Sequence, residues 1–106
     1  MIMTIQIRKA KHEDWKTVQK LNHEVFVVSY EYDKNLNMDW PFSPEGIGYY
    51  QDAIAKDDYF CYIAEAEGKS VGYLIGAIKN FSYRKNKVGE IENIGIAPEF
   101  RGKGVG

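Results

Sequence analysis

The stretch NIGIAPEFRGKGVG, residues 93–106, decides the fold because an apolar strand pattern runs through a proline into a glycine-rich turn. Glycine allows the backbone to turn sharply and to approach a ligand closely. Unsatisfied amide groups at the start of a helix bind anions, and Arg101 and Lys103 add positive charge here. The stretch therefore predicts a loop that binds a phosphate or pyrophosphate group. Its glycines are Gly102, Gly104 and Gly106.

Two common phosphate-binding loops do not fit this sequence. The Walker loop needs Gly-Lys followed by Ser or Thr to hold magnesium, whereas Gly102-Lys103 is followed by Gly104. The dinucleotide fingerprint is G-x-G-x-x-G inside a βαβ unit, whereas the spacing here is G-x-G-x-G. A generic nucleotide-binding domain is therefore disfavoured.

Two strands upstream form a predicted hairpin. Residues 59–66 and 69–78 alternate with a period of two on either side of Glu67-Gly68, which is too short a link for anything but antiparallel strands. Both faces of these strands are largely apolar, so we expect the sheet to be covered on both sides. A further strand is expected over residues 88–97, after a polar loop.

The N-terminal half predicts one strand and two helices. Residues 4–8 alternate as a strand, and an apolar stripe at spacings of three and four predicts a helix over residues 12–28. After an irregular segment, Ser43 is the expected N-cap of a second helix and Pro44 its first residue. The element order is βααβββ, and the predicted class is α+β.

Composition restricts the function classes. A chain of 106 residues forms one domain at most, and its net charge of −1 gives no field that attracts nucleic acid or an anionic membrane. No apolar run approaches the roughly 20 residues of a membrane helix. Cys61 is the one cysteine, which excludes an internal disulfide and favours the cytoplasm.

Together these features resemble the GNAT superfamily, the acetyl-CoA-dependent N-acetyltransferases. The sequence IENIGIAPEFRGKGVG resembles motif A of that family, whose signature Q/R-x-x-G-x-G/A matches Arg101, Gly104 and Gly106. TIQIRKAKHEDWKTVQKLN is similar to the family's first strand and helix, and GKSVGYLIGAI to its central strand. The resemblance implies a mixed, mostly antiparallel sheet with helices on both faces, acetyl-CoA as cosubstrate, no metal, and a small-molecule or peptide amine as acceptor.

The same resemblance assigns residues that bind acetyl-CoA. It implies that backbone groups of Ile96 and Ala97 pair with pantetheine, and that a backbone N–H near Ile94 stabilises the oxyanion. The residues implied to hold the pyrophosphate are Arg101, Gly102, Lys103, Gly104, Val105 and Gly106.

A proton acceptor is needed because the attacking amine is cationic at neutral pH. Glu90 and Glu92 are two residues apart and therefore share one face of their strand with Ile94 and Ile96, if no bulge intervenes. By resemblance either glutamate is a candidate base. The alternative is that both are solvated glutamates at the edge of the sheet.

The irregular segment between the two helices walls the acceptor site in the family. Aromatic and acidic side chains there suit a cationic amine, through charge and cation–π contact. The alternative is a surface loop with aromatic anchors. The candidate acceptor residues are Tyr30, Tyr32, Asp39 and Trp40.

Two further expectations follow from the resemblance. Residues 1–106 correspond to the N-terminal part of a single acetyltransferase domain, cut after the pyrophosphate loop, so we expect this chain alone to be inactive. Its open sheet edge would pair with another chain, for example in a homodimer. The alternative function is a non-catalytic module that binds acyl-CoA or regulates another protein.

Overall fold

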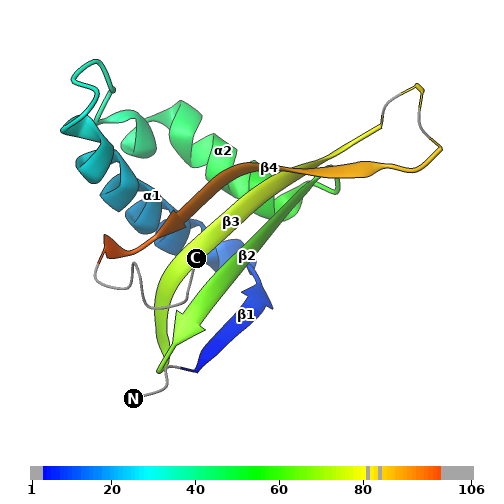
Figure 1. The fold of residues 1–106 in the computed structure, drawn as a ribbon, viewed down its shortest axis with the longest axis horizontal. Coiled ribbons are helices and arrows are strands. Elements are labelled where there is room, and N and C mark those ends of the chain that lie inside the picture. Colours follow the sequence, from blue (N-terminus) through cyan, green and yellow to red (C-terminus); the bar gives the residue numbers. More distant parts are fainter. Residues whose placement is uncertain (1–3, 81, 84, 99–106) are drawn as a thin grey trace.

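The computed structural model describes residues 4–80, 82–83 and 85–98, and these follow the predicted order βααβββ (Figure 1). The helices are α1 (Trp15–Tyr30) and α2 (Pro44–Ala55), each preceded by a short 3-10 turn, at His12–Asp14 and Trp40–Phe42. The strands are β1 (Ile5–Lys9), β2 (Tyr59–Ala66), β3 (Lys69–Lys79) and β4 (Val88–Ile96).

The four strands form one antiparallel sheet in the order β1-β2-β3-β4, so that β4 lies at an edge among the described residues (Figure 1). The turn between β2 and β3 confirms the predicted hairpin. Glu67 and Gly68 both have positive φ, at 53° and 77°, which is the conformation of the tight hairpin turn with a right-handed strand twist.

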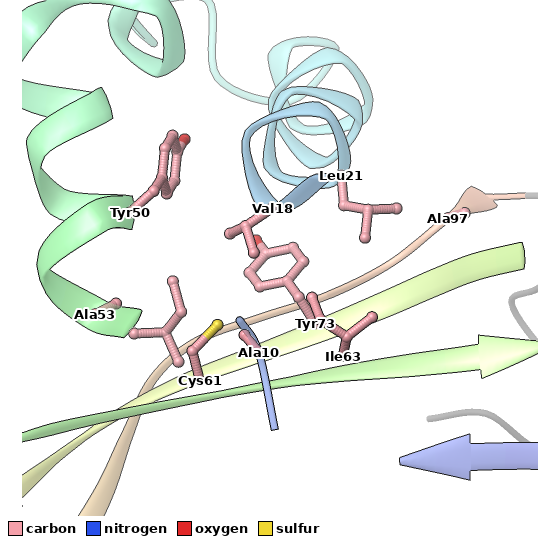
Figure 2. Packing of buried hydrophobic residues seen from close by; sticks show 10 residues of the cluster. Ala10, Val18, Leu21, Tyr50, Ala53, Cys61, Ile63, Tyr73 and Ala97 are labelled. Atoms are coloured by element: carbon pink, nitrogen blue, oxygen red, sulfur yellow. The ribbon is translucent and has the colours of Figure 1, made fainter. Parts of the chain in front are cut away.

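Both described helices pack on the same face of the sheet. The register places Cys61 opposite Ile75 and Ile63 opposite Tyr73, so these four side chains share one face. They form the core with apolar side chains from both helices (Figure 2). The helix residues of this core are Val18, Leu21, Tyr50 and Ala53.

The opposite face of the sheet exposes apolar side chains among the described residues. None of the described helices lies over it. Ile7 on β1 is 64% exposed and Ile94 on β4 is 55% exposed. A shallow apolar hollow of about 310 Å³ lies between them, and Tyr62 and Leu74 contribute to its lining. The strands carry apolar side chains on both faces, but the described helices pack against only one of these faces.

The helix starts depend on side chains next to them. Gly46 N donates to Ser43 Oγ at 3.0 Å, which confirms Ser43 as the N-cap of α2. The chain enters α1 through Asp14, whose Oδ2 accepts from Lys11 N at 2.6 Å and from Arg8 Nη1 at 2.7 Å. Because a 3-10 turn precedes it, α1 begins at Trp15 rather than His12.

Candidate functional site

Strand β4 contains a bulge at its centre. Ile91 pairs with Gly76 and Asn93 pairs with the adjacent Ile75, which leaves Glu92 as an extra residue without a partner across the ladder. The bulge separates side chains that a regular strand would place together. Glu90, opposite Ala77, lies on the helix side of the sheet, and Ile94, opposite Leu74, lies on the open side.

We expected Glu90 and Glu92 to share a face with Ile94 and Ile96 only in a strand without a bulge. Because β4 has a bulge, this condition is not met. Ile96 pairs with Gly72 and lies on the open face with Ile94. Glu90 is exposed on the other face.

Glu92 has a charged and an aromatic side chain near it. Its side chain is 28% exposed, and its Oε2 lies 3.9 Å from Lys79 Nζ. Tyr49 of α2 is close enough to interact with it electrostatically. Burial first, and then the negative charge of Glu92, raise the pKa of Tyr49 to about 12, partly offset by a hydrogen bond with Asn93.

A chain of buried hydrogen bonds joins both helices to the residue after the bulge. Tyr50 Oη donates to Asn22 Oδ1 at 2.5 Å, Asn22 Nδ2 donates to Tyr73 Oη at 2.8 Å, and Tyr73 Oη donates to Asn93 Oδ1 at 2.7 Å. The sequence reasoning missed this network. Asn22 gave the one available signal, because it is a polar residue beside Leu21 on the buried side of α1.

The backbone of Ile94 is directed toward the outer edge of the sheet. Ala97 N donates to Val71 O at 2.8 Å, which marks a hydrogen-bonded pair of the β3–β4 ladder. Such pairs alternate along antiparallel strands, so the N–H and C=O groups of Ile94 and Ile96 point away from β3. Ala97 itself has its N–H on β3 and its side chain in the core, where it is 5% exposed.

The four acceptor candidates lie in different environments. Trp40 is packed against the core, stacked with Phe26 at a centroid distance of 6.1 Å and tilted toward Tyr49 at 5.8 Å. Trp40 is therefore next to Tyr49, the α2 residue on which the charge of Glu92 acts. Tyr30 contacts Lys34 in a cation–π pair at 4.5 Å, Tyr32 is 87% exposed, and Asp39 is exposed.

The predicted pyrophosphate loop falls outside the described residues, which end at Pro98 on this side. Arg101, Gly102, Lys103, Gly104, Val105 and Gly106 all belong to it.

Several other chemistries find no support in the part of the chain that is described. Cys61 is 2% exposed, and burial raises the pKa of its thiol to about 11, which disfavours a nucleophilic thiolate. No three His, Cys, Asp or Glu side chains among the described residues are grouped for metal binding. Neither described helix is long and apolar enough to cross a membrane.

Two sequence comparisons bear on the family. The model of the acetyltransferase (GNAT) family matches residues 15–106. An uncharacterized N-acetyltransferase from Archaeoglobus fulgidus is 36% identical over 59 residues, which cover 55% of this chain and 40% of that protein.

Solved structures share the fold at low sequence identity. A possible acetyltransferase from Clostridium difficile 630 superposes with a TM-score of 0.73 at 19% identity, covering 95% of this chain and 62% of that one. A predicted acetyltransferase with acetyl-CoA from Clostridium acetobutylicum gives 0.67 at 19% identity, covering 96% and 66%.

This chain thus spans less than half of its curated relative and about two thirds of these structures. The match of the family model, over most of the chain, shows that it belongs to the acetyltransferase (GNAT) family.

Proposed function

We propose that this chain contributes the bulged strand of an acetyl-CoA-dependent N-acetyltransferase that acetylates a primary amine by direct attack. The bulge at Glu92 is the observation that carries the proposal. It interrupts the ladder at Glu92, close to Ile94, whose N–H and C=O groups point away from β3. Direct transfer needs both functions next to one reacting carbon, a proton acceptor for the amine and a hydrogen-bond donor for the oxyanion.

The residues of the outer edge suit acetyl-CoA. When bound, acetyl-CoA supplies a thioester carbonyl for the amine to attack. Backbone groups of Ile94 directed away from β3 can pair with the amides of a pantetheine arm, and the apolar side chains of the open face can contact its alkyl segments. Arg101, Lys103 and the glycines around them are proposed to hold the pyrophosphate.

Of the two glutamates, we assign the base to Glu92. An alkyl amine has a pKa of about 10.4 and is protonated at neutral pH, so a carboxylate must take up its proton directly or through water. Glu92 lies at the bulge and near Lys79, and its charge acts on Tyr49, whereas Glu90 is an exposed side chain opposite Ala77. Trp40 packs against Tyr49 and would form part of the acceptor pocket, with Tyr30, Tyr32 and Asp39 along its outer wall.

Small polyamines are the acceptor class that we favour over peptides. Two structures with the same fold are an aminoglycoside acetyltransferase from an uncultured soil metagenomic sample, in complex with trehalose and with sisomicin, at a TM-score of 0.68 and 20% identity. Acidic and aromatic side chains flank the end of α1, as a cationic small molecule requires. We place the reaction in the cytoplasm, because the buried thiol of Cys61 needs no oxidising compartment.

The test is thiol release from acetyl-CoA by a complete acetyltransferase domain that contains this chain, measured with a panel of small amines, aminoglycosides and peptides. We expect turnover with at least one small amine. Binding of acetyl-CoA without turnover of any amine would instead support the alternative, a non-catalytic module that binds acyl-CoA. Absence of both binding and turnover would overturn the proposal.

A further inference from the structure

We propose that Tyr73 is a positioning residue for the bulge of β4, holding Asn93 and, through it, the neighbouring Glu92. The proposal rests on the function proposed above and adds to it a residue that touches neither substrate. Tyr73 lies on β3, is 3% exposed, and rises from the sheet toward α1 beside Val18 (Figure 2).

The bulge does not by itself fix the orientation of the Glu92 side chain. In a regular ladder the partner residue and the pleat fix each side chain, but Glu92 has no partner between the pairs of Ile91 and Asn93. Its position must therefore be set by contacts of its neighbours. Asn93 is the neighbour whose side chain is held, because it faces the helices opposite the fully buried Ile75.

Tyr73 reaches Asn93 diagonally, because its own partner across the ladder is Gly95. A Cβ on Gly95 would lie 2.5 Å from Tyr73 Cε1 and 2.7 Å from Val25 Cγ2. Glycine at 95 is thus what leaves room for the tyrosine ring to lie across β4. The ring places Oη at 2.7 Å from Asn93 Oδ1.

The hydrogen bonds run in one direction, which gives the network an orientation. Tyr50 donates to Asn22, Asn22 donates to Tyr73, and Tyr73 donates to Asn93. Tyr73 thereby fixes the Asn93 side chain next to Glu92, the residue of β4 without a partner across the ladder.

The bond from Tyr73 to Asn93 is not needed to satisfy a buried polar group, unlike the other bonds of the network. Asn22 and Tyr50 are 2% and 0% exposed, so their mutual bond satisfies groups inside the core. Asn93 is half-buried and has access to water, so the core does not need Tyr73 to satisfy it. Satisfied buried networks rigidify the elements that they join, and this one joins both helices to β4.

The experiment compares Tyr73→Phe with Tyr50→Phe. Both remove one buried hydroxyl bonded to Asn22, but only Tyr73→Phe also removes the bond to Asn93, so the comparison isolates that bond. We expect Tyr73→Phe to lower kcat about 10- to 100-fold with KM for acetyl-CoA unchanged, as expected for a misplaced reacting group. We expect Tyr50→Phe to lower the melting temperature but to keep kcat near the wild-type value.

Two further measurements keep the outcome decisive. Asn93→Ala should lower kcat as Tyr73→Phe does, and the double variant should be no worse than either, because both break the same bond. Amide hydrogen exchange at residues 92–94 should be faster in Tyr73→Phe than in Tyr50→Phe, whatever the activity. Equal exchange and equal kcat in the two tyrosine variants would overturn the positioning role. If the wild type shows no turnover but the two tyrosine variants still differ in amide hydrogen exchange at residues 92–94, only the proposed function is overturned.

Discussion

Glu90 and Glu92 are two residues apart on one strand but have different surroundings, which makes them a matched pair of variants. We expect Glu92→Gln to lower kcat about 10²- to 10⁴-fold while acetyl-CoA still binds, because the cationic amine loses its proton acceptor. The deficit should shrink as pH rises, since more of the amine is then deprotonated in solution. The measurement is the rate of thiol release against pH.

Glu90→Gln is the control for that experiment. Its carboxylate is exposed and lies opposite Ala77, away from the bulge. We expect a rate close to that of the wild type. A larger loss in Glu90→Gln than in Glu92→Gln would reverse the assignment of the base.

Asp14 supports the entry into α1 and makes stability depend on pH. Its hydrogen bond with Arg8 holds its pKa below the usual 3.8, against the opposing effect of burial, and the Lys11 backbone N–H contributes in the same direction. A lowered pKa in the folded state means that the stabilisation is complete above about pH 4 and is lost as pH falls through the folded value.

We therefore expect Asp14→Asn to lower the free energy of unfolding by about 1–3 kcal/mol at neutral pH, because Arg8 loses a charged hydrogen-bond partner. The difference from the wild type should be smaller at pH 3 than at pH 7, because the stabilisation is lost as pH falls through the lowered pKa of Asp14. Urea unfolding at pH 7 and at pH 3 measures both values. A constant difference at the two pH values would contradict the role given to the ion pair.

At the scale of single residues, the sequence predicted the state of the Cys61 thiol but not the hydrogen bond between Tyr73 and Asn93. The buried, unreactive thiol of Cys61 was predictable, because the residue lies in an apolar strand without a nearby cation. The Tyr73–Asn93 bond was not predictable, because the two residues are far apart in the sequence and meet through a strand register that no local pattern encodes.

At the scale of single elements, local chemistry decided where α2 begins. Ser43 caps the helix and Pro44 starts it, as predicted, and the hairpin turn at Glu67-Gly68 was equally readable. The bulge in β4 was not. It is a property of how β3 pairs with β4, and the sequence of β4 reads the same with and without it.

Two glycines of α2 provide the test of how this helix is packed. A Cβ on Gly46 would lie 2.1 Å from Trp40 O, whereas a Cβ on Gly48 would meet no atom within 4 Å. We expect Gly46→Ala to destabilise the protein, because the backbone of the preceding 3-10 turn must move. Gly48→Ala should stabilise it by up to about 1 kcal/mol, because alanine is the better helix former.

Thermal unfolding of both variants gives the comparison, with opposite signs expected. The two substitutions are chemically identical and lie on the same helix, so a difference between them reports packing alone. Destabilisation of similar size in both variants would contradict the close contact between α2 and Trp40.

At the scale of the whole molecule, the apolar residues of the strands predicted the core but not how much of the sheet is covered. The observed register brings Cys61, Ile63, Tyr73 and Ile75 to one face, which α1 and α2 cover. For the other face the sequence of the strands predicted burial. The described helices both lie on the first face, because α1 and α2 also pack against each other.

The uncovered face is expected to bind apolar molecules. It presents Ile7, Tyr62 and Ile94 around a hollow of about 310 Å³, and exposed apolar surface of this kind binds anilinonaphthalene sulfonate dyes. We expect the 106-residue polypeptide to enhance the fluorescence of such a dye while its near-UV circular dichroism shows a packed core.

Tyr62→Lys should weaken the binding of the dye, because it places a charged group in the lining of the hollow. Val27→Lys is the control, since Val27 is 49% exposed on α1 and lies on the helix side of the sheet. Dye binding that is absent, or weakened equally by both substitutions, would show that the apolar face is not the site at which the molecule accepts apolar ligands.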